Sequence, residues 1–398
     1  VAVTASLRQR VEALRQPIPA PAATNSVNAD DLVVKVRRGP HIVDDTLARM
    51  GSWTVPRWRQ GVVVHFEGEQ GIDCGALTRE WAKILSQQLL RAGRGLFRRT
   101  PKGNRVVLLP DQESEMAHGE STEGMYVFVG RFIAYALLRS IRIDAVLTPF
   151  LFRLIIDPTA TATFDDLKEV DPSLHANLSL MRNCPPDEVY DTFCQCFCMD
   201  TEFLGVRRTV ELEPGGAAVP VTGDNVDRFT LLYAQYVLKD LSARAINAFL
   251  HGFYDLVPRG RLAGFSPAEF EAVLCGQPAI SDEDVEELRE ASHCSLDATG
   301  RPHRQVLWFW EVMRGLSADL RSMVVQFVTG NERPPLTGFA ALEHPFTVQV
   351  GEHLTPASLP EAHVCFNQLV LAPYASREVL RDKLLLAVRE GREGFEMV

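Results

Sequence analysis

One cysteine near the C-terminal end of the chain has neighbours that favour reactivity. Cys365 lies in the segment LPEAHVCFNQLVLAPYAS (359–376), two residues after His363. In an extended backbone the two side chains would project on the same side, where an imidazolium would favour the nucleophilic thiolate. Free cysteine is nevertheless among the most buried residue types, and a thiol beside Phe366 and Leu369 is more often part of a core. The chemistry of this segment alone leaves a nucleophile and a core residue both open.

Three further cysteines are candidate metal ligands. Cys194, Cys196 and Cys198 alternate along the chain, which would place them on one face of a strand. Zinc accepts thiolate ligands, but neighbours on a straight strand converge poorly, and the sequence contains neither a matching second pair nor an H-E-x-x-H motif. We therefore expect a small-residue core face here rather than a metal site.

The remaining polar motifs indicate structure rather than chemistry. The pair at 165–166 and the acidic run at 282–284 are typical of a helix N-terminus and a solvated face. GEQG at 68–71 fits a tight turn after a strand, and no phosphate-binding glycine motif occurs. A nucleotide-binding role has no support.

The composition favours a globular protein whose partners are proteins. The chain has 398 residues, of which 46% are hydrophobic and 23% charged, so two or three compact units are expected. A formal net charge of −10 argues against nucleic-acid binding, which requires clustered Lys and Arg. The most apolar stretch, 125–138, is shorter than a bilayer span of about 20 residues and contains Arg131, so no membrane span is expected. Eight cysteines are too few for a disulfide scaffold, so we expect free thiols and a cytoplasmic or nuclear location.

Hydrophobic periodicity outlines the elements that must position these residues. The segment 6–16 has a helical period and gives way to a Pro/Ala-rich connector at 17–26. Runs of β-branched residues at 32–36 and 62–66 indicate short strands. Further helices are expected over 77–90, 125–156, 173–181, 224–254, 267–275 and 306–330, with a strand-rich region over 192–223.

The segment 276–278 separates two helical patterns with a glycine and a proline, which indicates a short linker and a domain boundary. Beyond it we expect short strands around 346–350 and 365–371. A last helix would begin at the N-cap residue Ser376 and end at Gly391.

Several segments together resemble one family. The pattern L-P-x-A-H-x-C-F-N at 359–367 is similar to the active-site segment of HECT-type ubiquitin ligases. Other stretches resemble motifs of that family in the same order along the chain, from about residue 30 onward: FEGEQGIDCGALTREW (66–81), FVGRFIAYALL (128–138), ELEPGGAAVPVTGDNVDRF (211–229), HGFYDLVP (251–258), LCG (274–276), WFWEV (308–312) and QFVTGNERPPLTGF (326–339).

The resemblance implies an α+β fold with two lobes: a large, mostly α-helical N-lobe and a smaller α/β C-lobe. The N-lobe would cover 30–276 and the C-lobe 281–398, after an N-terminal helix and connector at 1–29. A short hinge at 277–280 would join the lobes, with Gln277, Pro278 and Ala279 as its bending residues.

The family's nucleophile falls at Cys365. The resemblance implies that Cys365 accepts ubiquitin from a charged ubiquitin-conjugating enzyme as a thioester and transfers it to a lysine of a protein substrate. This thioester exchange requires a thiolate nucleophile, but it does not require an elaborate set of general-base side chains. His363 and Asn367 would tune or orient the thiol, and Phe395, beyond the helix-ending Gly391, would dock on the N-lobe in the second step. No cofactor or metal is implied.

The conjugating enzyme would dock on an apolar groove of the N-lobe. Four residues fall at the matching places: Leu174, Leu178, Val189 and Phe229. Each also fits an ordinary core position, because all lie in helical or strand patterns. Phe395 likewise fits local packing under the last helix.

The chain departs from the family pattern at three places. Val364 stands where a threonine usually precedes the cysteine, Ala76 replaces a glycine, and Ala372 intrudes before a proline. These departures keep open a non-enzymatic scaffold that retained the fold. A cysteine hydrolase that pairs Cys365 with a distant histidine, His251 or His303, is the third possibility.

Overall fold

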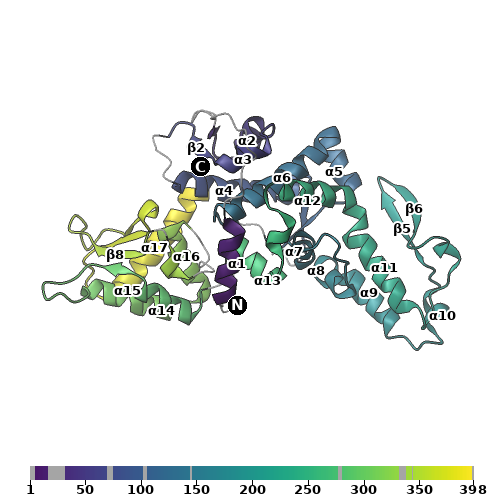
Figure 1. Ribbon diagram of the computed structural model, residues 1–398. Helices are drawn as coiled ribbons and strands as arrows, with labels where there is room; N and C mark the ends of the chain where they lie inside the picture. The colour runs from purple at the N-terminus through teal and green to yellow at the C-terminus, as the bar shows by residue number, and fades with distance from the viewer. Residues whose placement is uncertain are drawn as a thin grey trace. The chain divides into compact units, whose positions relative to one another are not determined.

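The computed structural model describes residues 5–16, 32–69, 75–101, 105–143, 146–276, 280–330, 338–342 and 344–396. The chain divides into two compact units, the first made of 1–88, 135–144 and 268–398 and the second of 89–134 and 145–267 (Figure 1). The predicted connector at 17–26 and the hinge residues Gln277, Pro278 and Ala279 lie outside the described residues. The division into lobes at 277–280 therefore stays a prediction.

The N-terminal part of the first unit contains the predicted helix and strands. Helix α1 (Ala5–Arg15) buries Leu7, Val11 and Leu14, which lie on one helical face. Strands β1 (Val33–Val36) and β2 (Val63–Phe66) pair in parallel, and the chain between them forms two helices. These are α2 (Ile42–Met50) and α3 (Val55–Gln60), and α4 (Ala76–Leu89) follows β2. The strands and helices predicted for this region are confirmed.

The second unit is mainly helical. Its elements are β3 (Phe97–Arg99), β4 (Val106–Leu108), α5 (Asp111–His118), most of α6 (Thr122–Leu138), α7 (Pro149–Ile156), α8 (Leu167–Val170), α9 (Pro172–Arg182), α10 (Val189–Phe193), β5 (Cys198–Phe203), β6 (Val206–Glu211), α11 (Val226–Leu238) and α12 (Ala243–Leu256). The expected continuous helical region over 125–156 is wrong. Helix α6 ends at Leu138, Ser140 adopts a left-handed φ of 58°, and α7 restarts with a proline in its first turn.

Two glycines allow α6 and α12 to cross at close range. A Cβ atom on Gly130 would lie 2.1 Å from the carbonyl oxygen of Phe249, and a Cβ on Gly252 would lie 2.0 Å from that of Val127. Each glycine thus faces the backbone of the opposite helix. The two belong to FVGRFIAYALL and HGFYDLVP, so two separate sequence motifs meet at this crossing.

The C-terminal part of the first unit is α/β and follows α13 (Pro267–Cys275). It contains α14 (Asp282–Glu290), β7 (His293–Cys294), α15 (Arg304–Gly315), α16 (Ala318–Thr329), β8 (Thr347–Val350), β9 (Glu361–His363), β10 (Gln368–Leu371) and α17 (Arg377–Glu396). Strand order is β7-β8-β10-β9, with β8 parallel to β7 and β10 and with β9 antiparallel to β10. A hydrophobic core that extends from Ile280 to Val388 joins the sheet to helices α14 to α17 (green to yellow in Figure 1).

The last helix begins where the sequence predicts and ends later. The Ser376 hydroxyl accepts the backbone N–H of Val379 at 3.3 Å, which confirms the predicted N-cap. The helix then continues through Gly391 to Glu396, so the predicted end at Gly391 is wrong. Arg and Glu around Gly391 are strong helix formers, and an interior glycine costs only about 1 kcal/mol. Phe395 therefore lies in the last turn of α17 and not in a tail.

Within the described part of the chain, no helix combines the length and the apolar character that a membrane span requires.

Candidate active site

Cys365 lies in the tight connection between the antiparallel strands β9 and β10. A 3-10 turn, Val364–Phe366, starts directly after His363, whose backbone has φ −108° and ψ 87°. The backbone N–H of Asn367 donates to the carbonyl of Val364 at 3.3 Å and closes the turn. The chain is therefore not extended from His363 to Cys365, and the strand expected over 365–371 begins only at Gln368. The argument that places both side chains on one face of a strand is wrong for this reason.

Asn367 holds this turn in place. Its backbone adopts the left-handed conformation, φ 51° and ψ 42°, which asparagine tolerates better than most residues. Its side-chain amide donates to the carbonyl of His344 at 2.7 Å, and its own carbonyl accepts the N–H of Thr347 at 2.9 Å. Asn367 is 9% exposed, so these bonds are sheltered from water. Asn367, one of the predicted site residues, therefore connects the turn to strand β8 through these hydrogen bonds.

On its other side, the turn packs against helix α16 through the side chain of Val364. That helix ends at Gly330, whose φ of 71° is left-handed. A Cβ atom on Gly330 would lie 3.0 Å from Cγ1 of Val364, so the valine side chain rests against the end of the helix. Val364 is one of the departures from the family pattern, and its methyl group has an apolar neighbour here.

The flanking aromatic and histidine side chains are open to solvent. Phe366 is 62% exposed, and its ring meets the ring of His344 edge-on at a centroid distance of 5.9 Å. His363 is also exposed. Tyr374, at the end of the same motif, is instead a core residue: its hydroxyl donates to the carbonyl of Ser358 at 3.0 Å, and burial raises its pKa to about 12. The motif thus combines an exposed turn with a buried anchor.

The four residues expected at a docking groove are mostly buried in the second unit. Leu178 is 5% exposed, and Val189 and Phe229 are each 1% exposed, whereas Leu174 is partly buried in the first turn of α9. The ring of Phe229 meets that of Phe197 edge-on at 5.5 Å. Phe229 therefore takes the core position that the sequence also allowed, because α11 turns this residue inward.

Other apolar side chains of the same region are exposed instead. They lie on α9, α10, α11 and the hairpin of β5 and β6: Leu180 (66%), Tyr190 (46%), Leu231 (46%), Leu204 (74%) and Val206 (55%). Sequence reasoning missed them. Helical periodicity contains a signal for Leu180, because it falls off the face that Leu174, Leu178 and Met181 share.

Comparison with known proteins identifies the family. The model of the HECT-domain (ubiquitin-transferase) family matches residues 83–398. The chain belongs to the HECT-domain family. Members of this family are ubiquitin transferases that act through a cysteine thioester. The predicted family and the α+β fold class are thereby confirmed.

Three curated proteins illustrate the similarity to HECT ligases. E3 ubiquitin-protein ligase UPL1 of Arabidopsis thaliana is 33% identical over 372 residues, which cover 92% of this chain and 10% of that protein. E3 ubiquitin-protein ligase Smurf1 of Drosophila melanogaster is 32% identical over 342 residues, 83% of this chain and 31% of that protein. E3 ubiquitin-protein ligase HUWE1 of Mus musculus is 31% identical over 372 residues, 92% of this chain and 8% of that protein. The chain therefore spans less than a third of the length of each.

The two histidines considered for a hydrolase have other surroundings in this HECT domain. His303 caps α15, because its ring Nδ1 accepts the backbone N–H of Gln305 at 3.2 Å. That nitrogen is engaged in a structural bond. His251 lies exposed on α12 in the second unit. Neither arrangement resembles a base oriented by a third group.

The three alternating cysteines do not share a strand. Cys194 ends α10 with a left-handed φ of 48°, Cys196 forms an isolated bridge with Pro220, and only Cys198 belongs to a strand, β5. None of the three is buried, so the expected small-residue core face is wrong. No group of three or more His, Cys, Asp or Glu side chains that could hold a metal occurs among the described residues.

Proposed function

We propose that this chain is the catalytic HECT domain of a ubiquitin-protein ligase and that Cys365 is its nucleophile. The observation that carries the proposal is the turn at Val364–Phe366, which lies within the matched family region and is fixed from two sides by Asn367 and α16. The side chains of His363 and Phe366 on either side of Cys365 are exposed. The non-enzymatic scaffold is the alternative that the experiment below tests.

The proposed reaction has two steps. The Cys365 thiolate attacks the thioester carbonyl of ubiquitin on the conjugating enzyme, a new thioester forms, and the thiolate of the conjugating enzyme leaves. A substrate lysine amine then attacks the Cys365 thioester, an isopeptide bond forms, the Cys365 thiolate leaves, and the amine loses a proton. Because one thioester replaces another in the first step, correct placement of the two sulfur atoms is the main requirement. A rigid turn supplies that placement on the side of Cys365.

The proposal places the conjugating enzyme on the second unit. Exposed apolar side chains such as Leu180, Tyr190 and Leu231 would form the contact surface, because exposed apolar patches mark protein interaction sites. The predicted residues Leu178 and Phe229 would act as the packed layer that holds α9 and α11 beneath it. A side-chain bond between the two helices, from Arg182 Nε to Asp227 at 2.7 Å, supports a fixed surface.

Three further assignments belong to the proposal. The segment 277–280 would be the hinge between lobes, because Cys365 must face first the conjugating enzyme and then a substrate lysine. Phe395 would act in the second step, so that Phe395→Ala slows isopeptide formation more than thioester formation. A cytoplasmic or nuclear location is in keeping with the six described cysteines, which are free thiols.

The test combines the chain with activating enzyme, a panel of conjugating enzymes, ATP and ubiquitin. A ligase gives a ubiquitin adduct that reductant removes; Cys365→Ser should give an adduct that resists reductant, and Cys365→Ala should give none. Cys294→Ser, which alters a half-buried free thiol of the same sheet, is the matched control and should load normally. A chain that forms no adduct with any conjugating enzyme is a scaffold, and one that cleaves ubiquitin conjugates instead is a hydrolase.

A further inference from the structure

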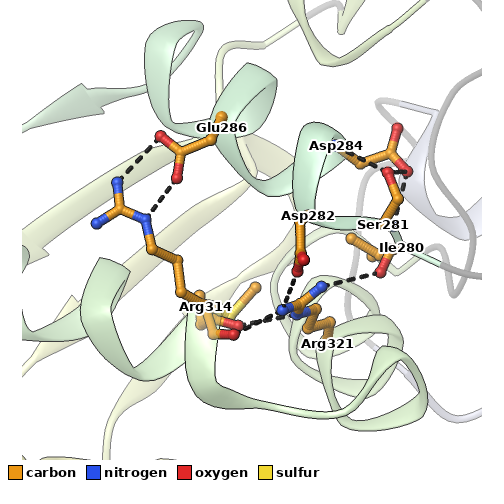
Figure 2. Close-up of polar contacts among 8 residues, drawn as sticks. Ile280, Ser281, Asp282, Asp284, Glu286, Arg314 and Arg321 are labelled. Atoms are coloured by element: carbon orange, nitrogen blue, oxygen red, sulfur yellow. Dashed lines mark hydrogen bonds and ion pairs between the residues drawn. The ribbon is translucent and has the colours of Figure 1, made fainter.

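A buried arginine gathers four contacts at the beginning of helix α16. The side chain of Arg321 is 8% exposed. Its Nε donates to the carbonyl of Met313 at 2.9 Å and its Nη2 to that of Arg314 at 2.6 Å, while Nη1 donates to that of Ile280 at 3.4 Å. Nη2 also pairs with Asp282 at 2.5 Å. Figure 2 shows this guanidinium reaching the end of one helix and the start of another.

The groups that Arg321 binds explain what the contact fixes. The carbonyls of Met313 and Arg314 lie in the last turn of α15, where carbonyls lack the regular helical partner four residues on; that of Met313 also accepts the N–H of Leu316 at 3.4 Å. Ile280 is the first described residue after 277–279, and its side chain is fully buried in the C-terminal core. Arg321 therefore ties the point where the chain joins this core to α15 and α16. A buried cation is stable only where hydrogen bonds compensate for lost water, so this geometry is restrictive.

The opposite end of the same helix touches the Cys365 turn. Helix α16 has 12 residues, about 18 Å at 1.5 Å per residue, and ends at Gly330 against Val364. One rigid element thus has Arg321 and Ile280 at its beginning and the turn of Cys365 at its end. The helix also packs against α17 and β10, which limits sideways movement.

We propose that α16 is a strut that sets the position of the Cys365 turn relative to residue 280, and that Arg321 is its positioning residue. The inference rests on the proposed function, because it gives the strut the task of carrying Cys365 to a partner's thioester. Arg321 acts through the helix and makes no contact with the reacting atoms. A displacement of about 1 Å at the reacting sulfur is enough to slow such a step by about 100-fold.

A neighbouring arginine provides the matched control. Arg314 and Glu286 form an ion pair on the surface, where their side chains are 47% and 40% exposed (Figure 2). Arg314→Gln removes this pair but keeps the backbone carbonyl that Arg321 uses. The capping box between Ser281 and Asp284 does not use the guanidinium, so α14 can still form in an Arg321 variant. Faster exchange in its first turn then reports the lost contacts of Arg321 with Ile280 and Asp282.

The first measurement is single-turnover loading of Cys365 from a charged conjugating enzyme. Arg321→Met keeps an unbranched chain but removes every donor, and we expect it to slow loading by at least about tenfold. Arg321→Lys keeps the charge but not the planar fork, and should show the same direction of change. Arg314→Gln should load within about twofold of the parent chain, as substitutions of exposed residues usually do little.

The second measurement is amide hydrogen exchange, which needs no ubiquitin. A strut requires faster exchange in Arg321→Met in the segments that contact the two ends of α16: at Val285 in the first turn of α14, whose N–H bonds to Ser281, and at Asn367, whose N–H closes the Cys365 turn. Gly351, which bonds to Leu371 in the same sheet, should exchange as before. Arg321→Lys replaces Arg321→Met in both assays if the latter does not fold.

Each result decides the matter. Faster exchange at both ends together with slow loading supports the strut. A response at Val285 alone makes Arg321 a local clamp, and a response that includes Gly351 makes it an ordinary stabilising residue; either result overturns the proposal. If the parent chain forms no adduct with any conjugating enzyme, the proposed function fails by itself, and the exchange measurement still decides whether α16 couples its two ends.

Discussion

Replacement of Gly130 by alanine tests why two of the family motifs contain glycine. Gly130 faces the backbone of α12, and the added methyl carbon would lie 2.1 Å from the carbonyl oxygen of Phe249 and 2.7 Å from the backbone nitrogen of Phe253. Ordinary contact begins at 3.4 Å, so the methyl is more than 1 Å too close. Both obstructing atoms belong to a helix backbone and cannot rotate away. The helices α6 and α12 must therefore separate.

The magnitude follows from two opposed effects. Overpacking of a close interface costs about 1–3 kcal/mol, and the upper value applies here because no side chain can yield. Alanine is the better helix former by about 1 kcal/mol, which offsets part of that cost. The net expectation is a loss of about 2 kcal/mol, or about 4–8 °C in melting temperature for a unit of this size.

Gly124→Ala is the matched control on the same helix. No atom lies within 4 Å of a Cβ at Gly124, and the residue is exposed. Only the helix-propensity gain remains there, so the melting temperature should stay constant or rise by about 1–3 °C. Thermal unfolding followed by circular dichroism measures all variants, and hydrogen exchange of α6 and α12 amides assigns the loss to the crossing.

The double variant makes the test stricter. Gly252 faces the carbonyl of Val127 at the same crossing, so one separation of the helices would relieve both alanines. The loss in Gly130→Ala with Gly252→Ala should therefore be clearly smaller than the sum of the single losses. Equal melting temperatures for Gly130→Ala and Gly124→Ala would refute the close crossing, and strict additivity would show that the two glycines act at independent sites.

Three further predictions concern single side chains. The Arg314 guanidinium lowers the pKa of Glu286 from 4.5 to about 2. The ion pair therefore stabilises the fold fully above about pH 4.5, and this stabilisation is lost as the pH falls toward 2. The difference in melting temperature between the parent chain and Glu286→Gln should shrink between pH 4.5 and pH 2. Phe229→Ala should cost about 3–5 kcal/mol as a core truncation, whereas the exposed Leu231→Ala should change stability by less than about 0.5 kcal/mol; equal denaturant midpoints would contradict the burial of Phe229. Ser281→Ala should cost about 1 kcal/mol, measured by denaturant unfolding, because it removes the N-cap of α14.

Helix positions were predictable where one face of the helix is apolar and a capping residue marks its end. The apolar positions of α1 recur at helical spacing, and Ser376 caps α17 as its type suggests. Period alone misled the prediction at the three alternating cysteines. A two-residue repeat occurs there across a helix end, a bridge and a strand, and only the left-handed residue Cys194 explains how the chain passes between them. A left-handed cysteine, unlike a left-handed asparagine, has no residue-type signal in the sequence.

The candidate site was predictable in its residue types but not in its geometry. A motif located Cys365 and Asn367, yet the bond from Asn367 to His344 joins residues 23 positions apart and depends on the pairing of β8 with β10. The exposure of individual apolar side chains was the property that the sequence predicted least well. Phe229 and Leu231 are two positions apart on α11, and the tertiary packing against Phe197 decides which of them is buried. Interface residues chosen by motif alone can thus be core residues that support the interface.

The same distinction applies to Val364, the departure from the family pattern beside the proposed nucleophile Cys365. From the sequence, its missing hydroxyl is one of the departures that keep a non-enzymatic scaffold open, because threonine usually stands there. In the structure the side chain rests on Gly330, at the end of the helix that begins next to Arg321. A valine has a methyl group where a threonine has its hydroxyl, and the contact with the end of α16 is made by its methyl carbon Cγ1. The substitution therefore affects the packing of the Cys365 turn as well as the polarity around its sulfur. Kinetics separate the two effects. Altered packing changes the rate of loading by the conjugating enzyme, whereas altered polarity changes the rate of reaction with any small thiol reagent.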